Sequence, residues 1–220
     1  MKLFLLLSAL LLAAPPQTRQ PVVVISTTLG EIQVQLDAVH APITTKNFLQ
    51  YVDLAHYSGG RFHRTVTMTN QPDKKIKIEV IQGGVNPAAE QIDFPPIKLE
   101  RTNQTGIRHQ DGTISMARDG ADSATSDFFI CIGDQPELDF GGKRNPDGQG
   151  FAAFGKVTAG MNVVRKIQAS PAKGQTLEPP IVIKSIRRKV YALAIAPRQS
   201  RVAQLSNKKP CRRADEGASL

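Results

Sequence analysis

Residues 112–130 read GTISMARDGADSATSDFFI, with apolar segments at both ends and a run rich in Gly, Asp and Ser between them. Each apolar segment has the length of a β-strand, whereas Gly, Asp and Ser favour turns and loops. The stretch therefore predicts two short strands joined by a polar connection.

The same pattern of short apolar segments and turn residues continues on both sides of this stretch. Residues 22–36, VVVISTTLGEIQVQL, predict a hairpin that turns at Gly30. Further strands are predicted by KIKIEVIQGG (75–84), FAAFGKV (151–157) and IVIKSIRRKV (181–190). Apolar residues at helical spacing predict one helix within residues 41–57 and another within 160–169. Many short strands with two helices favour a mainly β fold, either an antiparallel barrel or a sandwich, with helical caps.

Residues 59–66, GGRFHRTV, form a strand pattern with an unusual feature. Successive side chains of a strand point to opposite faces, so strict alternation puts Phe62 and Arg64 on the same face. If Phe62 faces the core, an arginine faces the same way. The pattern therefore marks Arg64 as a residue with a special environment.

The composition indicates a folded globular chain, because 40% of the residues are hydrophobic and 21% are charged. The net charge of +9 is concentrated near the C-terminus, since ten of the 28 Lys and Arg residues, and no Asp or Glu, lie between Lys184 and Arg213. Residues 3–183 hold equal numbers of basic and acidic side chains. We therefore expect no nucleic-acid binding by the folded domain. The basic tail, residues 191–220, is predicted either to be solvated or to contact an anionic surface or nucleic acid.

The N-terminus, MKLFLLLSALLLAAPPQTRQ, has a basic start, a short apolar run, two alanines and then prolines. This layout predicts a signal peptide and short linker over residues 1–20, and the apolar run is short for a membrane span. An uncleaved membrane anchor is the alternative. We thus expect an exported protein, periplasmic or secreted. It should consist of one domain at residues 21–190 and a flexible tail, and we expect a monomer.

Familiar catalytic motifs are absent from the sequence. It contains neither a G-x-S-x-G elbow nor a P-loop. Its four histidines do not show metal-ligand spacing, so we expect no metal and no cofactor. Cys131 lies in the apolar segment FFICIG and is predicted to be a buried thiol that does not pair with Cys211 of the tail. If the chain is an enzyme, its reaction should need no covalent or proton-transfer step.

Several stretches together resemble the cyclophilin family of peptidyl-prolyl isomerases, in the same order and at similar spacing. The resemblance covers about residues 22–189, and the long central stretch followed by FGKV is its most specific part. It implies a closed eight-stranded antiparallel β-barrel capped by two α-helices, with activity on X-Pro bonds of folding proteins and no cofactor. The stretches are FHR (62–64), QGG (82–84), GTISMARDGADSATSDFFI (112–130), ELDF (137–140) and FAAFGKVTAGMNVVRKI (151–167).

The resemblance also implies a role for individual residues. Arg64 matches the family's catalytic arginine and Gln82 the glutamine that helps to position it. The expected partners are unfolded or flexible polypeptides that contain proline. Substrate binding is implied for a strand edge, a pocket floor and a pocket wall, formed by Ala117, Arg118, Asp127, Phe129, Leu138 and Phe151.

Three acidic residues depart from the family pattern. Asp127 stands where the family usually has Gln, Glu137 stands where it has an aromatic residue, and an ungapped match puts Glu79 at an aromatic position of the proline pocket. A segment between Arg64 and Gln82 is also longer than usual. These acids leave an alternative open, a binding module that holds proline-containing segments with little turnover. A third hypothesis makes the basic tail the functional part.

Overall fold

The computed structural model describes residues 19–87 and 93–190. The predicted basic tail and nearly all of the predicted signal peptide lie outside these ranges. Gln20 belongs to the folded domain, because its side chain donates to Asp37 (3.3 Å) and accepts from the backbone N–H of Ala38 (2.9 Å). Within the described ranges, no helix combines the length and hydrophobicity that crossing a membrane requires.

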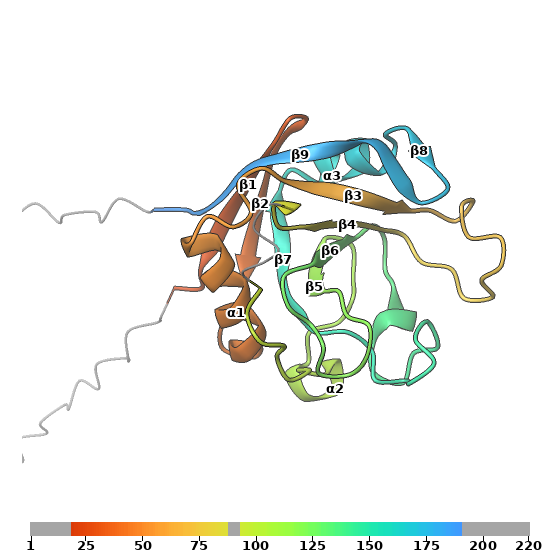
Figure 1. Ribbon diagram of the computed structural model, residues 1–220. Coiled ribbons are helices and arrows are strands. Elements are labelled where there is room, and N and C mark those ends of the chain that lie inside the picture. Colours follow the sequence, from red (N-terminus) through yellow and green to blue (C-terminus); the bar gives the residue numbers. More distant parts are fainter. Residues whose placement is uncertain (1–18, 88–92, 191–220) are drawn as a thin grey trace, which may run out of the picture. The chain divides into compact units, whose positions relative to one another are not determined.

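The described residues form an antiparallel β-barrel (Figure 1). Eight strands pair in the order β1-β2-β7-β5-β6-β4-β3-β9, and pairing of β9 with β1 closes the barrel; β8 pairs with β9. The strands are β1 (Val22–Thr27), β2 (Gly30–Leu36), β3 (Gly60–Val66), β4 (Val80–Gly84), β5 (Thr113–Met116), β6 (Phe128–Cys131), β7 (Ala153–Ala159), β8 (Ala172–Lys173) and β9 (Thr176–Arg188). The predicted closed eight-stranded barrel is confirmed.

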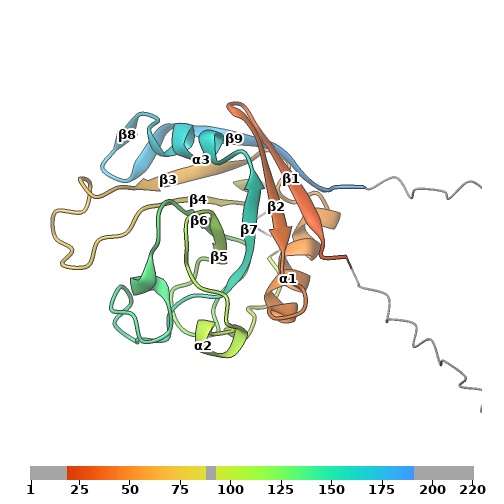
Figure 2. The ribbon, with the colours of Figure 1, turned by 180° about the vertical axis from the view of Figure 1, so that it is seen from behind.

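Both predicted helices are present. Helix α1 (Pro42–Asp53) begins with a proline in its first turn, where the missing N–H is not needed, and α3 (Met161–Gln168) buries one face. The two lie at different ends of the barrel in both views (Figures 1 and 2). A third helix, α2 (Thr102–Thr105), was not predicted, because a single turn is too short to show helical periodicity.

Aromatic side chains fill the barrel interior. Phe48 of α1 packs against Phe128 and Phe154, with ring centroids 5.6 and 5.2 Å apart. Phe128 also meets the rings of Tyr57 and Phe62 edge-on. All five are fully buried. The barrel is therefore a packed core and not a channel.

A β-bulge at His63 overturns the prediction that Phe62 and Arg64 share a face. Phe62 pairs with Gly83 and Arg64 pairs with the adjacent Gln82, so two residues of β3 span one step of β4. The extra residue reverses the alternation, which is how bulges re-aim side chains. Phe62 accordingly lies in the interior, whereas Arg64 points to the outer face.

The outer face of the same strands carries a second apolar cluster. It consists of Val66, Ile78, Val80, Phe129, Cys131 and Leu138. Because β4 and β6 alternate, Phe129 joins this outer cluster while its neighbour Phe128 joins the interior. Cys131 is buried, as predicted, and Cys211 lies outside the described residues. One sheet thus builds both the core and the floor of a surface pocket.

Candidate active site

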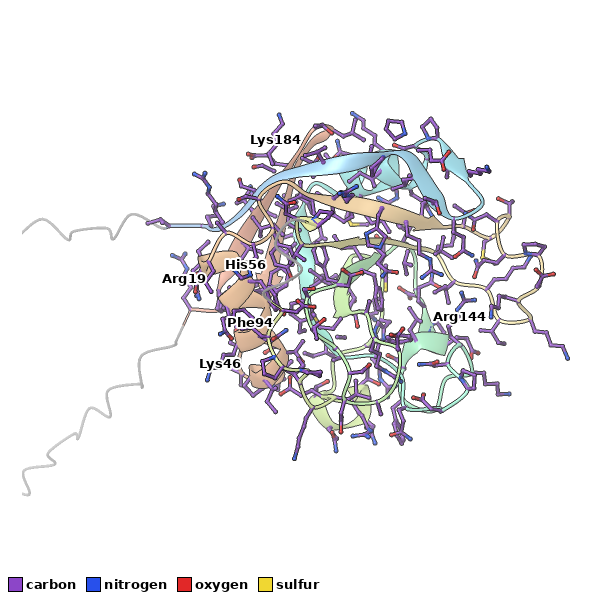
Figure 3. All side chains as sticks on the ribbon, in the orientation of Figure 1. Arg19, Lys46, His56, Phe94, Arg144 and Lys184 are labelled. Atoms are coloured by element: carbon purple, nitrogen blue, oxygen red, sulfur yellow. The ribbon has the colours of Figure 1, made fainter. Side chains whose placement is uncertain are left out.

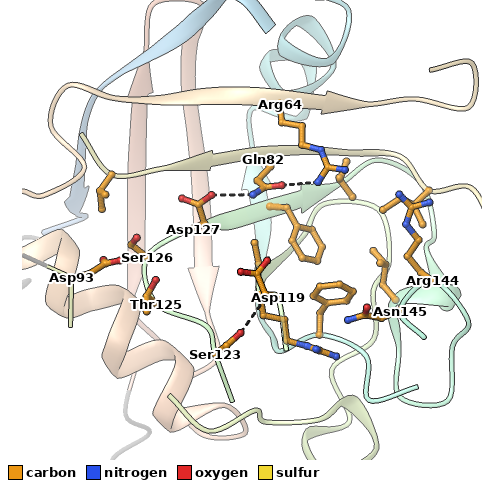
Figure 4. Close-up of a pocket in the computed structure, with 18 residues that line it drawn as sticks. Arg64, Gln82, Asp93, Asp119, Ser123, Thr125, Ser126, Asp127, Arg144 and Asn145 are labelled. Atoms are coloured by element: carbon orange, nitrogen blue, oxygen red, sulfur yellow. Dashed lines mark hydrogen bonds between the residues drawn. The ribbon is translucent and has the colours of Figure 1, made fainter. Parts of the chain in front are cut away.

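A cavity of about 530 Å³ lies over the outer cluster (Figure 4). All eight predicted site residues line it: Arg64, Gln82, Ala117, Arg118, Asp127, Phe129, Leu138 and Phe151. They come from β3, β4, β6 and the connections that follow β5 and β6, so the fold brings together residues that are up to 87 positions apart in the sequence.

The floor of the cavity is apolar. Phe129 forms its centre, and Phe151 meets that ring edge-on with centroids 5.4 Å apart. Ile78, Val80 and Leu138 add aliphatic surface around it. A flat ring with aliphatic walls suits a compact apolar group such as a pyrrolidine ring.

The Phe129 ring is supported from behind by a buried polar group. His109 stacks on it at 5.9 Å and 15°. The His109 ring joins Asp139 through Nδ1 (2.8 Å) and Ser115 through Nε2 (3.0 Å). Burial by itself would raise the pKa of Asp139, but the hydrogen bonds from the His109 ring and backbone outweigh it and lower that pKa. The hydrogen bonds at both ring nitrogens fix the orientation of the His109 ring, which in turn supports the Phe129 ring.

Arg64 is held at the edge of this floor by two neutral side chains. Its Nη1 donates to Gln82 Oε1 (3.0 Å), while Nε and Nη2 both donate to Gln175 Oε1 (2.9 and 2.6 Å). Gln175 is anchored in turn, because its Nε2 donates to the carbonyl of Asn70 (3.2 Å). Burial lowers the pKa of Arg64, although a guanidinium remains charged at neutral pH. The arrangement fixes a cation without neutralising it.

Asp127 contacts this assembly through Gln82. Its Oδ2 accepts from Gln82 Nε2 (2.9 Å) and lies 3.5 Å from His63 Nε2. Gly84 leaves room for the carboxylate, because a Cβ at that position would collide with Asp127 Oδ1. The acid therefore orients the glutamine amide, and the amide oxygen is left to accept from Arg64.

A model of the family described as cyclophilin type peptidyl-prolyl cis-trans isomerase/CLD matches residues 22–188. The chain belongs to the cyclophilin-type peptidyl-prolyl cis-trans isomerase family. The predicted family and enzyme class are confirmed. The sequence-based roles of the eight cavity residues stay predictions, which the cavity's geometry makes testable.

The similarity to known proteins extends over most of the length of each relative. Peptidyl-prolyl cis-trans isomerase A of Dickeya dadantii is 37% identical over 175 residues, which are 75% of this chain and 83% of the relative. Peptidyl-prolyl cis-trans isomerase cyp18 of Streptomyces antibioticus is 35% identical over 170 residues, which are 74% of this chain and 95% of the relative. A Cryptosporidium parvum cyclophilin type isomerase, crystallised in the presence of the dipeptide Ala-Pro, has a TM-score of 0.63 at 21% identity and covers 77% of this chain and 99% of its own. This structure supports the cyclophilin fold.

Two of the three acidic departures from the cyclophilin pattern lie outside the cavity. Ile78, Val80 and Gln82 line it, so the intervening Glu79 points away and accepts from Gln168 Nε2 (3.2 Å). The prediction that Glu79 occupies the pocket is therefore wrong, and alternation along IKIEVIQ explains why. Glu137 is half-buried, does not line the cavity, and accepts from the backbone N–H of Lys143 (2.8 Å). Of these three acidic residues, Asp127 alone places a carboxylate beside the Arg64 assembly.

Arg118 has a structural role at the edge of the cavity of this cyclophilin. Its side chain is 1% exposed and donates to the Asp147 carboxylate (2.8 and 3.0 Å) and to the Gly150 carbonyl. The guanidinium also lies 5.1 Å above the Phe151 ring. The Ala117 N–H donates to the Asp127 carbonyl (2.9 Å). A role of this strand edge in binding the substrate backbone stays a prediction.

Gln175 and Arg144 are among the residues at the site that the sequence-based prediction missed. Gln175 lies in the turn between β8 and β9, and Arg144 lies in the loop before β7; neither turn sequence carries a signal of a pocket. Among the described side chains, no three His, Cys, Asp or Glu residues gather to hold a metal. The expectation of a reaction without cofactor stays a prediction.

Proposed function

We propose that the cavity binds X-Pro segments and that Arg64 accelerates their isomerisation by stabilising the twisted amide. The observation that carries this proposal is a charged, rigidly held guanidinium at the edge of an apolar floor. Three hydrogen bonds to Gln82 and Gln175 fix it, and no ion pair within the described ranges involves it.

Peptide-bond rotation makes a specific demand on a catalyst. The barrier of about 18–20 kcal/mol arises because rotation breaks amide resonance. In the twisted state the proline nitrogen becomes pyramidal and more basic, so a hydrogen-bond donor stabilises that state more than either planar isomer. A fixed arginine donates without losing its proton and needs no reorganisation. Phe129 and its aliphatic neighbours hold the proline ring while the preceding residue turns.

The proposed substrates are unfolded or flexible polypeptides that contain proline. The apolar floor suits the ring, and X-Pro bonds exchange in tens to hundreds of seconds without a catalyst, slowly enough to limit folding. The crystallisation of the C. parvum structural neighbour with Ala-Pro supports this substrate class.

A protease-coupled peptide assay with the full chain tests the mechanism. We expect Arg64→Ala to lower kcat/KM by about 10²–10³-fold, as loss of a pre-oriented transition-state donor does. Arg64→Lys should recover only part of this loss, because an ammonium lacks the planar fork. Arg61→Ala is the matched control, since Arg61 lies on the same strand but does not line the cavity. Equal activity of Arg64→Ala and the wild type would refute the mechanism.

Asp127 is the observation that favours the alternative, a proline-peptide binding module with little turnover. Its carboxylate bonds the same glutamine that holds Arg64, so it lowers the positive potential near the guanidinium. The same assay distinguishes the two functions. Saturable peptide binding with no turnover above background supports the module, and turnover that depends on Arg64 supports the enzyme.

A further inference from the structure

Arg144 lines the same cavity as Arg64 and the carboxylate-paired Arg118. Arg144 lies in the loop between β6 and β7, on the side of the barrel away from Lys46 and His56 (Figure 3). Its Nη1 donates to Gln71 Oε1 (2.7 Å) and to the carbonyl of Ile76 (2.6 Å). Both acceptors belong to the long segment between β3 and β4 and are neutral. The inserted segment thus fixes a cation at the cavity.

Arg64 and Arg144 differ from three other arginines of the domain, which pair with carboxylates. Arg118 pairs with Asp147 at 2.8 Å, Arg165 with Asp111 at 3.1 Å, and Arg188 with Asp53 at 2.6 Å. In the described ranges no ion pair is formed by Arg64 or Arg144. Two like charges that share a half-buried cavity repel each other, and neutral acceptors do not cancel that repulsion.

The effect of this repulsion is visible in Arg144. Burial lowers its pKa, and the charge of Arg64 lowers it further. An anion between the two guanidinium groups would relieve the repulsion and accept from donors that are already oriented. A carboxylate matches a guanidinium in shape as well as in charge.

The opposite side of the cavity has the opposite charge. Asp93 and Asp119 line it, and Figure 4 shows Asp93 across the cavity from Arg64 and Arg144. Asp127 lies nearer to Arg64, where it accepts from Gln82 Nε2 (2.9 Å). Helix α1 and the segment after it hold this side in place, because Asn47 Nδ2 donates to the Thr125 carbonyl (2.6 Å) and Tyr57 OH to the Ser126 carbonyl (2.7 Å). A charged substrate side chain therefore meets a different potential on the two sides of the proline.

We propose that this site prefers substrates with an acidic side chain on one flank of the proline, where Arg64 and Arg144 receive its carboxylate. The proposal rests on the proposed function, because the proline ring on Phe129 places the flanking residues. The acidic side of the cavity makes the preference specific to one flank. The substrate class is therefore a Pro-containing segment with Glu or Asp next to the proline on the arginine side.

The experiment compares four proline peptides that carry Glu or the isosteric neutral Gln either before or after the proline. We expect a Glu/Gln ratio of kcat/KM of roughly three to ten at one position, and a ratio at or below one at the other. Arg144→Gln should bring the favourable ratio close to one. Arg165→Gln removes the same charge from an exposed position on α3, and should keep the wild-type ratio. Raising the salt concentration should reduce the favourable ratio.

Two results would overturn the proposal: ratios near one at both positions in the wild type, or a favourable ratio that survives Arg144→Gln. Failure of the proposed function looks different, because no peptide of either charge would then be turned over. In that case, anisotropy of the same four peptides with a fluorescent label measures the Glu/Gln ratio of binding. That ratio supports or overturns the charge preference without any turnover.

Discussion

The barrel interior and the outer pocket are built by the same strands yet differ in what they require of their side chains. The interior around Phe128 is apolar and fully enclosed, so packing is its main constraint. The pocket around Phe129 is open and must also hold Arg64 in one orientation. Two adjacent residues of β6 therefore belong to different parts of the molecule. Strand alternation thus separates stability from function within a single sheet.

Replacement of these two neighbours gives the largest expected effects. Phe128→Ala should lower the free energy of unfolding by about 3–5 kcal/mol, because it opens a cavity among Phe48, Tyr57 and Phe62. Phe129→Ala should cost less, because the space left by this buried ring opens into the surface cavity, but it should lower kcat/KM by about 10–100-fold through lost contact with the proline ring. Urea unfolding and the coupled assay measure the two quantities.

Phe128→Leu keeps this comparison testable if Phe128→Ala does not fold. We expect this milder variant to lose stability and retain most of its activity. The proposed division between core and pocket would be wrong if Phe129→Ala were less stable than Phe128→Ala. It would also be wrong if Phe128→Leu were less active than Phe129→Leu.

Replacing Gln175 tests whether catalysis depends on the orientation of Arg64 as well as on the apolar surface of the pocket. Gln175→Ala removes the acceptor of two Arg64 hydrogen bonds and should lower kcat by roughly tenfold with little change in KM, because the donor is misplaced in the transition state. In an Arg64→Ala background the same change should have no further effect, which a double-mutant cycle measures.

Gln168→Ala is the matched control for this variant. Gln168 bonds Glu79 outside the cavity, so its replacement should leave kcat unchanged. A loss of kcat from Gln175→Ala that persists in the absence of Arg64 would indicate a general structural defect and not a positioning role.

The smallest expected effect is a change in the pH dependence of stability, and it concerns the Asp139 carboxyl, which bonds His109 behind the pocket floor. The pKa of Asp139 is lowered in the folded state, so its stabilising contribution is present above the ordinary Asp pKa of about 3.9 and is lost as the pH falls through the folded pKa. Below about pH 4, the urea midpoint of Asp139→Asn should therefore fall less steeply with pH than that of the wild type. Asp73→Asn, an exposed change of the same charge, controls for net charge. Parallel pH profiles of Asp139→Asn and the wild type would contradict this prediction.

Much of the site could be predicted because its residues lie in short stretches that resemble a known family. Arg64, Gln82 and Phe129 were assigned from FHR, QGG and the central stretch, and the structure brings all three to one cavity. Glu79 was misassigned because an ungapped match ignored the alternation that puts Ile78 and Val80 in the cavity. Gln175 and Arg144 were missed, since turns at distant positions carry no signal of what they contact.

Most strands, helices α1 and α3, the family and the catalytic candidates could be predicted from the sequence alone, because local periodicity and short motifs are properties of neighbouring residues. The positions at which charged side chains meet depend on tertiary contacts. The bulge at His63 separates Phe62 from Arg64, and the Gln175 turn and the 67–79 segment bring neutral acceptors to two arginines. These contacts join residues far apart in the chain, and their geometry depends on how the barrel closes.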